Sequence, residues 1–315
     1  MTEAVQADAQ SGRILLTGGT GFVGSNLRRA LAGHRIRLLV RDPANYQSLA
    51  SDTVELVEGD ITEPESIQGA LDGCSIVINL VAIIEESGKR TFDLVNRQGT
   101  ENLVNEAKRV GGVERFIQMS ALGADNNPRY GYMIAKWQAE QAVKQSGIPW
   151  TIFRPSIIFG PGDGFINVLA GLVRSFPIIP VVGSGESKFQ PVAVEEVAES
   201  FARAVADPAT IGHTYELGGG KIYTYEQLLD SIAAKLGKRK RKAHVPIGLM
   251  MPAVILSKPL PKALRPPVTE EQLKMLALDN CTDNSATAAL IGRPPLRLED
   301  AMDYILPGAQ NSRPA

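Results

Sequence analysis

The sequence predicts an α/β fold, in which a doubly wound parallel sheet is followed by a smaller C-terminal α+β lobe. Short, nearly all-apolar runs alternate with helical patterns between residues 13 and 160, as in parallel strands covered on both faces. A glycine-rich turn follows the first of these runs, and prolines and glycines become frequent near residue 160. The 315 residues are enough to bury a core of this size.

The composition predicts a compact protein without a strong overall charge. The chain has 33 Lys and Arg against 34 Asp and Glu, a net charge of −1, so we expect no nucleic-acid partner. Cys74 and Cys281 lie far apart without metal-ligand spacing, which predicts no disulfide, no metal site and a reducing, cytoplasmic compartment. Residues 1–12 lack the pattern of a targeting peptide. We expect them, and residues 307–315, to be a disordered leader and tail.

The glycine-rich turn predicts a dinucleotide site. The strand-like run 13–17 leads into Gly18, Gly21 and Gly24, and a helical pattern begins at Phe22. Residues without a Cβ let the backbone approach a pyrophosphate, and the helix N-terminus offers unpaired N–H groups to the phosphates. A glycine-rich turn with no ligand is the alternative, but strand, glycines and helix follow in the order that a Rossmann site requires. The residues expected at the pyrophosphate are Gly18, Thr20, Gly21, Phe22 and Val23.

The end of the second predicted strand, residues 35–40, bears on the choice between NADP and NAD. Arg41 follows this strand, and an arginine there pairs with the 2′-phosphate of NADP. Asp42 comes next, and an acidic side chain there accepts the ribose hydroxyls of NAD, so NAD stays open. Arg41 as a solvated surface charge is the third reading.

Two further predicted strands, residues 54–58 and 75–82, end at the same edge of the sheet. Asp60 follows the first of them and either borders the adenine or only holds the turn. Thr62 and Glu65 have the spacing of a capping box, which predicts a helix through Leu71. The other residues expected along this crevice edge are Ile61, Leu80, Val81 and Ala82.

A tyrosine and a lysine with helical spacing form the candidate catalytic pair. A long helix over residues 91–110 and a strand over 115–119 lead to Ser120 at the strand's carboxyl end. Tyr132 and Lys136 then share one face of the next predicted helix. The ammonium would lower the pKa of the phenol for proton exchange with a carbonyl or hydroxyl, and Ser120 would donate a hydrogen bond to the same oxygen. The alternative is an unreactive surface pair; Tyr130 is the poorer candidate, since isoleucine stands four residues after it.

These features together resemble an atypical or extended short-chain dehydrogenase/reductase, over nearly the whole chain. The likeness rests on TGGTGFVG at 17–24, the serine after the fifth strand, the YxxxK pair, and RPS at 154–156 through FGPGD at 159–163. The chain most resembles the branch related to the nucleotide-binding accessory subunit of respiratory complex I. Residues 39–42, LVRD, add a likeness to NmrA-like proteins.

The resemblance implies roles for particular residues. It implies that Ser120, Tyr132 and Lys136 are the catalytic set and that Lys136 also holds the nicotinamide ribose. The segment implied to border the nicotinamide consists of Pro155, Ser156 and Ile157. Ser120 and Tyr132 are twelve residues apart, closer than in sugar-nucleotide epimerases and dehydratases, so the chain departs from that group.

The second half of the chain is expected to build the substrate side. We predict an NADP-binding domain over 13–160 and a substrate or partner lobe over 161–306. The sheet of the first domain can receive strands from both parts. Within the lobe we expect a helix over 197–205, and another that begins at a Thr224–Gln227 capping box.

The basic run 238–242 precedes the apolar stretch 245–256, which is too short to span a bilayer. Together they predict either peripheral contact with an anionic membrane or membrane complex, or a solvated turn before a pocket-lining or core helix. Met250 and Met251 suggest a hydrophobic ligand.

Three functions follow from these predictions. The first is an NAD(P)H-dependent oxidoreductase that transfers hydride to or from a small, hydrophobic or quinone-like carbonyl or alcohol. The second is an accessory or assembly subunit of a membrane respiratory or photosynthetic complex, in which the nucleotide is structural or a redox signal. The third is a sugar-nucleotide epimerase or dehydratase, which the short segment between Ser120 and Tyr132 disfavours.

Overall fold

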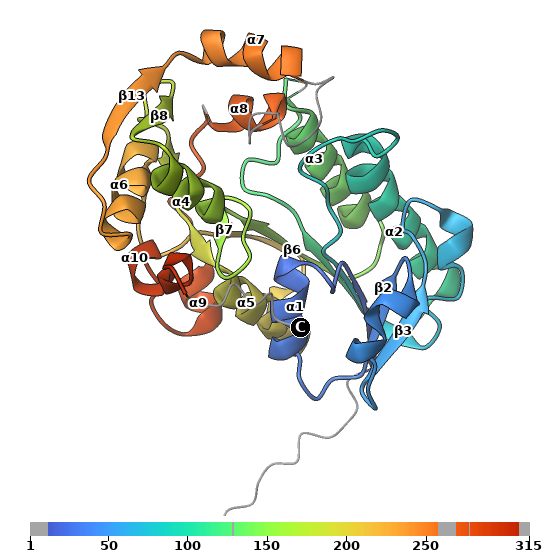
Figure 1. Ribbon diagram of the computed structural model, residues 1–315. Helices are drawn as coiled ribbons and strands as arrows, with labels where there is room; N and C mark the ends of the chain where they lie inside the picture. Colours follow the sequence, from blue (N-terminus) through green and yellow to red (C-terminus); the bar gives the residue numbers. More distant parts are fainter. Residues whose placement is uncertain (1–11, 128, 258–268, 277, 309–315) are drawn as a thin grey trace, which may run out of the picture.

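A computed structural model describes residues 12–127, 129–257, 269–276 and 278–308 (Figure 1). The predicted leader therefore lies outside the described residues except for Gly12, and the predicted tail except for Pro307 and Gly308.

The molecule is built around a seven-stranded, all-parallel sheet with the order β11-β6-β5-β4-β1-β2-β3. Strand order reverses between β1 and β4, and such a reversal opens a ligand crevice at the carboxyl ends of the strands. The predicted doubly wound α/β fold is confirmed. The strands are β1 (Arg13–Thr17), β2 (Ile36–Val40), β3 (Val54–Glu58), β4 (Cys74–Asn79), β5 (Arg115–Met119), β6 (Trp150–Pro155) and β11 (His213–Leu217).

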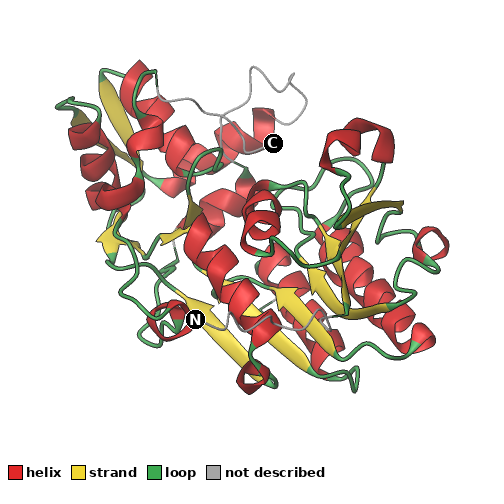
Figure 2. Cartoon of the chain, turned by 90° about the horizontal axis from the view of Figure 1, so that it is seen from below, coloured by secondary structure: helices red, strands yellow, loops and turns green. Residues whose placement is uncertain are grey.

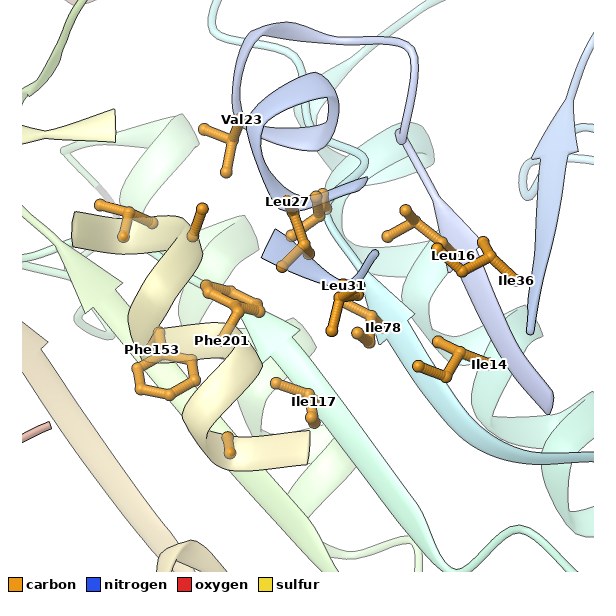
Figure 3. Packing of buried hydrophobic residues seen from close by; sticks show 14 of the residues in the cluster. Ile14, Leu16, Val23, Leu27, Leu31, Ile36, Ile78, Ile117, Phe153 and Phe201 are labelled. Carbon is orange, nitrogen blue, oxygen red and sulfur yellow. The ribbon is translucent and has the colours of Figure 1, made fainter. Parts of the chain in front are cut away.

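Helices cover both faces of this sheet (Figures 1 and 2). On one face lie α1 (Phe22–Ala30) and α5 (Val194–Ala206), and their apolar side chains share one core with the strands. Figure 3 shows Leu27 and Leu31 beside β1, and the Phe201 ring lies 4.5 Å from that of Phe153. The other face is covered by α2 (Gly99–Val110) and α3 (Gly131–Lys144).

Part of the C-terminal half returns to the sheet. The helix expected in the second lobe is α5, which packs on α1, and α9 (Thr287–Ile291) packs on α5 in turn. Strand β11 joins the open edge of the sheet beside β6. The nucleotide-binding layer is thus completed by residues beyond 160, because the apolar faces of β5 and β6 need α5 to cover them.

The remaining elements form a smaller unit with its own core. Helices α4 (Ile166–Ser175) and α6 (Tyr225–Lys235) pack together, and α6 begins at the predicted Thr224–Gln227 capping box. Its strand pairs are parallel β8 (Ile178–Val182) and β13 (Arg241–Val245), parallel β7 (Ile158–Phe159) and β10 (Val192–Ala193), and antiparallel β9 (Lys188–Phe189) and β12 (Tyr223–Thr224). Short helices complete it: α7 (Ile247–Ser257), α8 (Glu270–Leu276) and α10 (Leu298–Ala301).

Two local predictions are wrong. The helix expected from Thr62 to Leu71 is only a 3-10 turn over Pro64–Ile67, because the Thr62 hydroxyl donates to Asp60 and caps nothing. The fourth strand ends at Asn79 rather than Ala82. The helical run expected over 91–110 is present, but a π-helix over Asp93–Gln98 precedes α2.

Candidate active site

The turn between β1 and α1 is built on close backbone packing. Gly18 has φ +70°, and a Cβ there would lie 3.1 Å from the backbone of Leu80 and Val81. A Cβ on Gly24 would lie 2.3 Å from the carbonyl oxygen of Gly18. Only glycine fits either position, so the turn lies directly against the end of β4, as predicted.

Helix α1 begins with an open N-terminus. Its N-cap residue is Gly21, no side chain caps it, and its first turn contains no acidic residue. Val23 is buried in the core, so that only its backbone can meet a ligand. Uncapped N–H groups and a positive helix end suit a pyrophosphate. The residues present therefore fit the dinucleotide that the sequence predicts.

Arg41 and Asp42 differ in what their side chains do. The Asp42 carboxylate caps the 3-10 turn over Pro43–Leu49 and accepts hydrogen bonds from the Ala44 N–H at 3.0 Å and the Asn45 amide at 2.6 Å. Arg41 is exposed, and its charge contributes to lowering the pKa of Asp60. The arginine, rather than the aspartate, is thus available at the crevice.

Asp60 holds a turn. Its Oδ1 accepts hydrogen bonds from the Thr62 N–H at 2.9 Å and hydroxyl at 2.8 Å, and Arg90 lies 3.6 Å away. Burial acts to raise the pKa of Asp60, but these hydrogen bonds and the charges of Arg90 and Arg41 outweigh it and lower the pKa. Ile61 is buried, 2.7 Å from where a Cβ on Gly99 would be, so its side chain packs on the start of α2.

The catalytic candidates gather where β5 ends and α3 begins. Lys136 is 1% exposed, and its Nζ donates to the carbonyl oxygen of Met119 at 2.5 Å. The next residue, Ser120, is 4% exposed, and its hydroxyl has no hydrogen-bond partner among the described residues. Tyr132 lies one turn before Lys136, with its ring edge-to-face against Phe92 at 5.8 Å. A buried hydroxyl normally has a hydrogen-bond partner, and none of the described residues supplies one for Ser120.

The pKa values differ from the expectation. Burial raises the pKa of Tyr132 to about 12, and burial lowers the pKa of Lys136 to about 8 against the opposing charge of Glu140. The expectation that the ammonium lowers the phenol's pKa is therefore wrong for this structure, because desolvation dominates and Lys136 donates to a carbonyl instead. Tyr132 is held as a neutral phenol, which is a proton donor.

Sequence reasoning missed a buried ion pair behind Lys136. Glu140, one turn further along α3, is fully buried and accepts from Nε and Nη2 of Arg154 at 2.8 and 2.7 Å. Its (i, i+4) spacing from Lys136 was the available signal. The buried amide of Asn79 was also missed; it joins neighbouring strands and α2 through hydrogen bonds with Thr17, Thr100 and Gln118.

Residues 155–157 connect the sheet to the C-terminal part. Pro155 ends β6, and the Ser156 hydroxyl donates to the carbonyl oxygen of Gln190. The Ile157 N–H donates to the Asn280 side chain at 3.0 Å. The segment lies at the carboxyl edge of the sheet, while its serine hydroxyl is used in a structural contact.

A cavity of about 790 Å³ adjoins the start of α3. Its walls come from residues 85–88, the π-helix, α3, α7 and α8. Phe92, which contacts the Tyr132 ring, is among the lining residues. The charged side chains that line it are Glu85, Glu86, Asp93, Glu270, Glu271 and Lys274.

None of the described helices is both long enough and apolar enough to cross a membrane.

Comparison with known proteins agrees with this geometry. A family model described as NAD(P)H-binding matches residues 18–170. A ceramide reductase from Caulobacter vibrioides is 30% identical over 240 residues, which cover 75% of this chain and 74% of the relative. Subunit 9 of the alpha subcomplex of mitochondrial NADH dehydrogenase from Arabidopsis thaliana is 31% identical over 240 residues, 74% of this chain but only 60% of that subunit.

A solved structure shares the fold. The NADPH complex of an NADPH-dependent quinone oxidoreductase from Escherichia coli superposes with a TM-score of 0.72 at 24% identity, over 91% of this chain and 97% of that one. Fold, family match and relatives agree: this chain belongs to the NAD(P)H-binding, atypical short-chain dehydrogenase/reductase family of Rossmann oxidoreductase-like proteins.

Proposed function

We propose that this protein is an NADPH-dependent reductase of small or hydrophobic carbonyl compounds. The observation that carries the proposal is the end of β5, where buried Lys136 donates to the Met119 carbonyl next to the Ser120 hydroxyl, which has no partner among the described residues. Tyr132, a neutral phenol one turn before Lys136 on α3, packs in a cluster with Ala121. We further propose that residues 13–160, completed by α5 and β11, hold the cofactor and that the smaller unit supplies most of the substrate contacts.

Each side chain has a distinct role in this proposal. A nicotinamide held beside Lys136 and residues 155–157 would supply the chemistry of a hydride donor, with its electron pair, for the carbonyl carbon. Tyr132 gives its phenolic proton to the carbonyl oxygen, so that the C=O becomes CH–OH, and a proton from solvent later restores the phenol. Ser120 donates a hydrogen bond to the same oxygen, and Lys136 stabilises the tyrosinate that forms.

The phosphate-binding side supports NADP over NAD. Arg41 is exposed near Asp60, whereas the Asp42 carboxylate is already used to cap a turn. An arginine in this place pairs with a 2′-phosphate, and an occupied aspartate is a poor acceptor for the ribose hydroxyls.

We further propose that the substrate approaches Tyr132 through the cavity beside α3, whose lining includes Phe92 but not Tyr132 itself. The charge of this cavity argues against a sugar nucleotide. Five carboxylates and one lysine line it, and like charges placed together across a binding site cost several kcal/mol. A sugar nucleotide would bring a diphosphate toward these carboxylates. An uncharged carbonyl such as a ketone, aldehyde or quinone meets no such repulsion. The names of two relatives, a ceramide reductase and a 3β-hydroxysteroid dehydrogenase, concern hydrophobic compounds and support the same class.

The test follows the fluorescence of bound NADPH while ketones, aldehydes and quinones are added. We expect at least one class to oxidise the cofactor, and Tyr132→Phe to reduce kcat by about 10²- to 10⁴-fold with NADPH affinity unchanged. Tyr130→Phe is the matched control, because that phenol precedes the same helix and should leave kcat unchanged. Failure of every acceptor, or full activity of the Tyr132 variant, would refute the proposal.

A second candidate, an accessory subunit that docks at a membrane surface, is favoured by a group of exposed apolar side chains. Of the eight large apolar residues exposed in the described chain, three lie on the single helix α7: Leu249, Ile255 and Leu256. Leu249 and Leu256 are 70% and 75% exposed. Singly exposed apolar residues are ordinary, whereas a group of them marks a surface for interaction.

The basic run leads into β13, whose far end continues into α7, and the run partly serves the fold. Lys242 in β13 contacts Glu226 and Asp230, while Lys238 and Lys240 donate to backbone carbonyls. Cations beside apolar side chains favour an anionic bilayer.

Sedimentation with vesicles tests the second candidate. We expect binding to phosphatidylcholine vesicles that contain phosphatidylglycerol, weaker binding without it, and loss of binding in the double variant Leu249→Glu/Leu256→Glu. The control places the same charges on two exposed isoleucines elsewhere, Ile211→Glu/Ile222→Glu, which should bind like the unaltered protein. No binding to either vesicle would reject a lipid surface.

A further inference from the structure

We propose that Glu271 is a positioning residue, which caps the helix that carries the catalytic pair and holds Tyr132 in place for proton transfer. Its Oε1 accepts the backbone N–H of Tyr132 at 3.0 Å, although 139 residues separate the two along the chain. The role in proton transfer rests on the function proposed above. The contact itself does not, and the experiment below separates the two.

Helix α3 has no cap of its own. The residue before it, Tyr130, makes no side-chain cap, and its first turn contains no acidic residue. The first N–H groups of a helix need acceptors from outside it, and a negative charge is stabilising at that end. Glu271 meets both needs from another part of the fold. The catalytic tyrosine is the second residue of α3, so a loose first turn would move its ring directly.

The element that carries Glu271 is itself well held. Thr269 and Gln272 form a reciprocal pair at the start of α8, with hydrogen bonds of 2.9 and 3.2 Å. Leu273 is fully buried, and Met275 packs against the cluster that contains Phe92 and Tyr132. Helix α8 therefore contacts the surroundings of Tyr132 both through Glu271 and through an apolar side chain.

The position of this contact gives it a consequence for catalysis. Glu271 also lines the cavity between α3, α7 and α8. Glu271 therefore joins the smaller unit to the helix that carries Tyr132 at the wall of the cavity through which we propose the substrate enters. Loss of the contact should then affect kcat more than cofactor binding, because the residues expected at the pyrophosphate lie at the start of α1.

Two variants separate the hydrogen bond from the charge. Glu271→Ala removes the acceptor, and Glu271→Gln retains an oxygen that can accept the same N–H. Glu106→Ala is the control, because the Glu106 carboxylate on α2 likewise accepts a backbone N–H, that of Gly69 at 2.8 Å, which is not part of α3. Each full-length variant is examined by hydrogen exchange at the amides of the first turn of α3, by NADPH affinity and by kcat.

We expect Glu271→Ala to speed exchange at the Tyr132 amide about fivefold and to lower kcat by a similar factor, which is the usual effect of losing a helix cap. NADPH affinity should stay unchanged, Glu271→Gln should restore most of both losses, and Glu106→Ala should show neither. Unchanged exchange in Glu271→Ala would overturn the contact, and faster exchange with full kcat would overturn the positioning role. A protein that reduces no carbonyl at all would instead refute the proposed function, and the exchange result would still decide whether Glu271 caps α3.

Discussion

Helices α1 and α3 both begin at the carboxyl edge of the sheet, but the first turn of α1 is uncapped whereas that of α3 is capped by a carboxylate. Helix α1 starts at a glycine with no side-chain cap and no acid in its first turn. Helix α3 also lacks a cap of its own, but a carboxylate from α8 occupies its first turn. One positive helix end is left for an anion from outside, and the other is neutralised by the protein.

The difference suits the two helices to different tasks: α1 to binding a phosphate, and α3 to holding the proposed proton donor, Tyr132. An open helix end costs stability unless a ligand satisfies its N–H groups, and a phosphate does so well. The helix that carries the proton donor needs a fixed geometry in every state, so an internal carboxylate suits it better. Three substitutions, at Gly21, Lys136 and Arg41, test this difference between the cofactor side and the helix of Tyr132, beginning with the largest expected effect.

Placing a carboxylate at the start of α1 should make it resemble α3. Gly21 has φ −82°, which any residue adopts, and a Cβ there would lie 3.3 Å from the Gly18 carbonyl oxygen, so Gly21→Asp needs only a small local shift. We expect NADPH affinity to fall more than about 100-fold through repulsion of the pyrophosphate. The free protein should instead gain about 0.5–1 kcal/mol from the new cap.

Gly21→Asn is the matched control for that change. It has the same size and caps as well as aspartate but carries no charge. We expect its NADPH affinity to be much closer to that of the unaltered protein, as measured by cofactor fluorescence, with thermal unfolding as the stability readout. Equal losses in both variants would show that bulk, and not the open positive end, decides binding.

Helix α3 also differs from α1 in that it buries a cation, Lys136. Burial lowers the pKa of Lys136 from 10.5 to about 8. The unfolded chain binds more protons than the folded one between these values, so stability rises with pH from about 8 to 10.5. Below pH 8 the burial costs about 3 kcal/mol, because each pKa unit corresponds to about 1.4 kcal/mol. Lys136→Met should therefore be about 2 kcal/mol more stable at pH 7, after allowance for the lost hydrogen bond.

Urea unfolding at several pH values measures this advantage, which should shrink as the pH approaches 10.5. In the unaltered enzyme, kcat/KM for carbonyl reduction should be level below pH 8 and fall above it, as Lys136 loses its proton. A stability difference that is independent of pH would contradict the assigned cost of burying the charge.

Arg41→Asp tests the residue proposed to bind the 2′-phosphate of NADPH, and we expect it to have the smallest effect of the three substitutions. We expect the preference for NADPH over NADH to fall about tenfold or to invert, because an arginine–phosphate pair becomes a repulsion. Arg35→Asp, before β2, is a matched change of charge at the opposite end of the strand and should leave the preference unaltered. Dissociation constants for both cofactors provide the measurement.

Local patterns in the sequence predicted β1 to β5, the turn at Gly18–Gly24 and the Thr224 cap. Each depends on residues within a few positions of one another, where backbone geometry and hydrophobic period dominate. The helix predicted after Thr62 does not form, because the Thr62 hydroxyl donates to the Asp60 carboxylate instead of capping a helix. The spacing of Thr62 and Glu65 does not reveal this local alternative. The predicted lowering of the Tyr132 pKa is wrong for a different reason, since burial raises this pKa and the Lys136 ammonium donates to the Met119 carbonyl instead.

By itself, the sequence determined the parallel sheet, its nucleotide-binding edge and the order in which the candidate catalytic side chains arrive there. Only the tertiary structure decided that α5 and β11 complete the sheet, that Glu140 pairs with Arg154 behind Lys136, and that Glu271 caps the helix of Tyr132. These contacts join residues that are distant in the chain. Their partners are chosen by packing and by the need to satisfy buried polar groups, which no short stretch of sequence records.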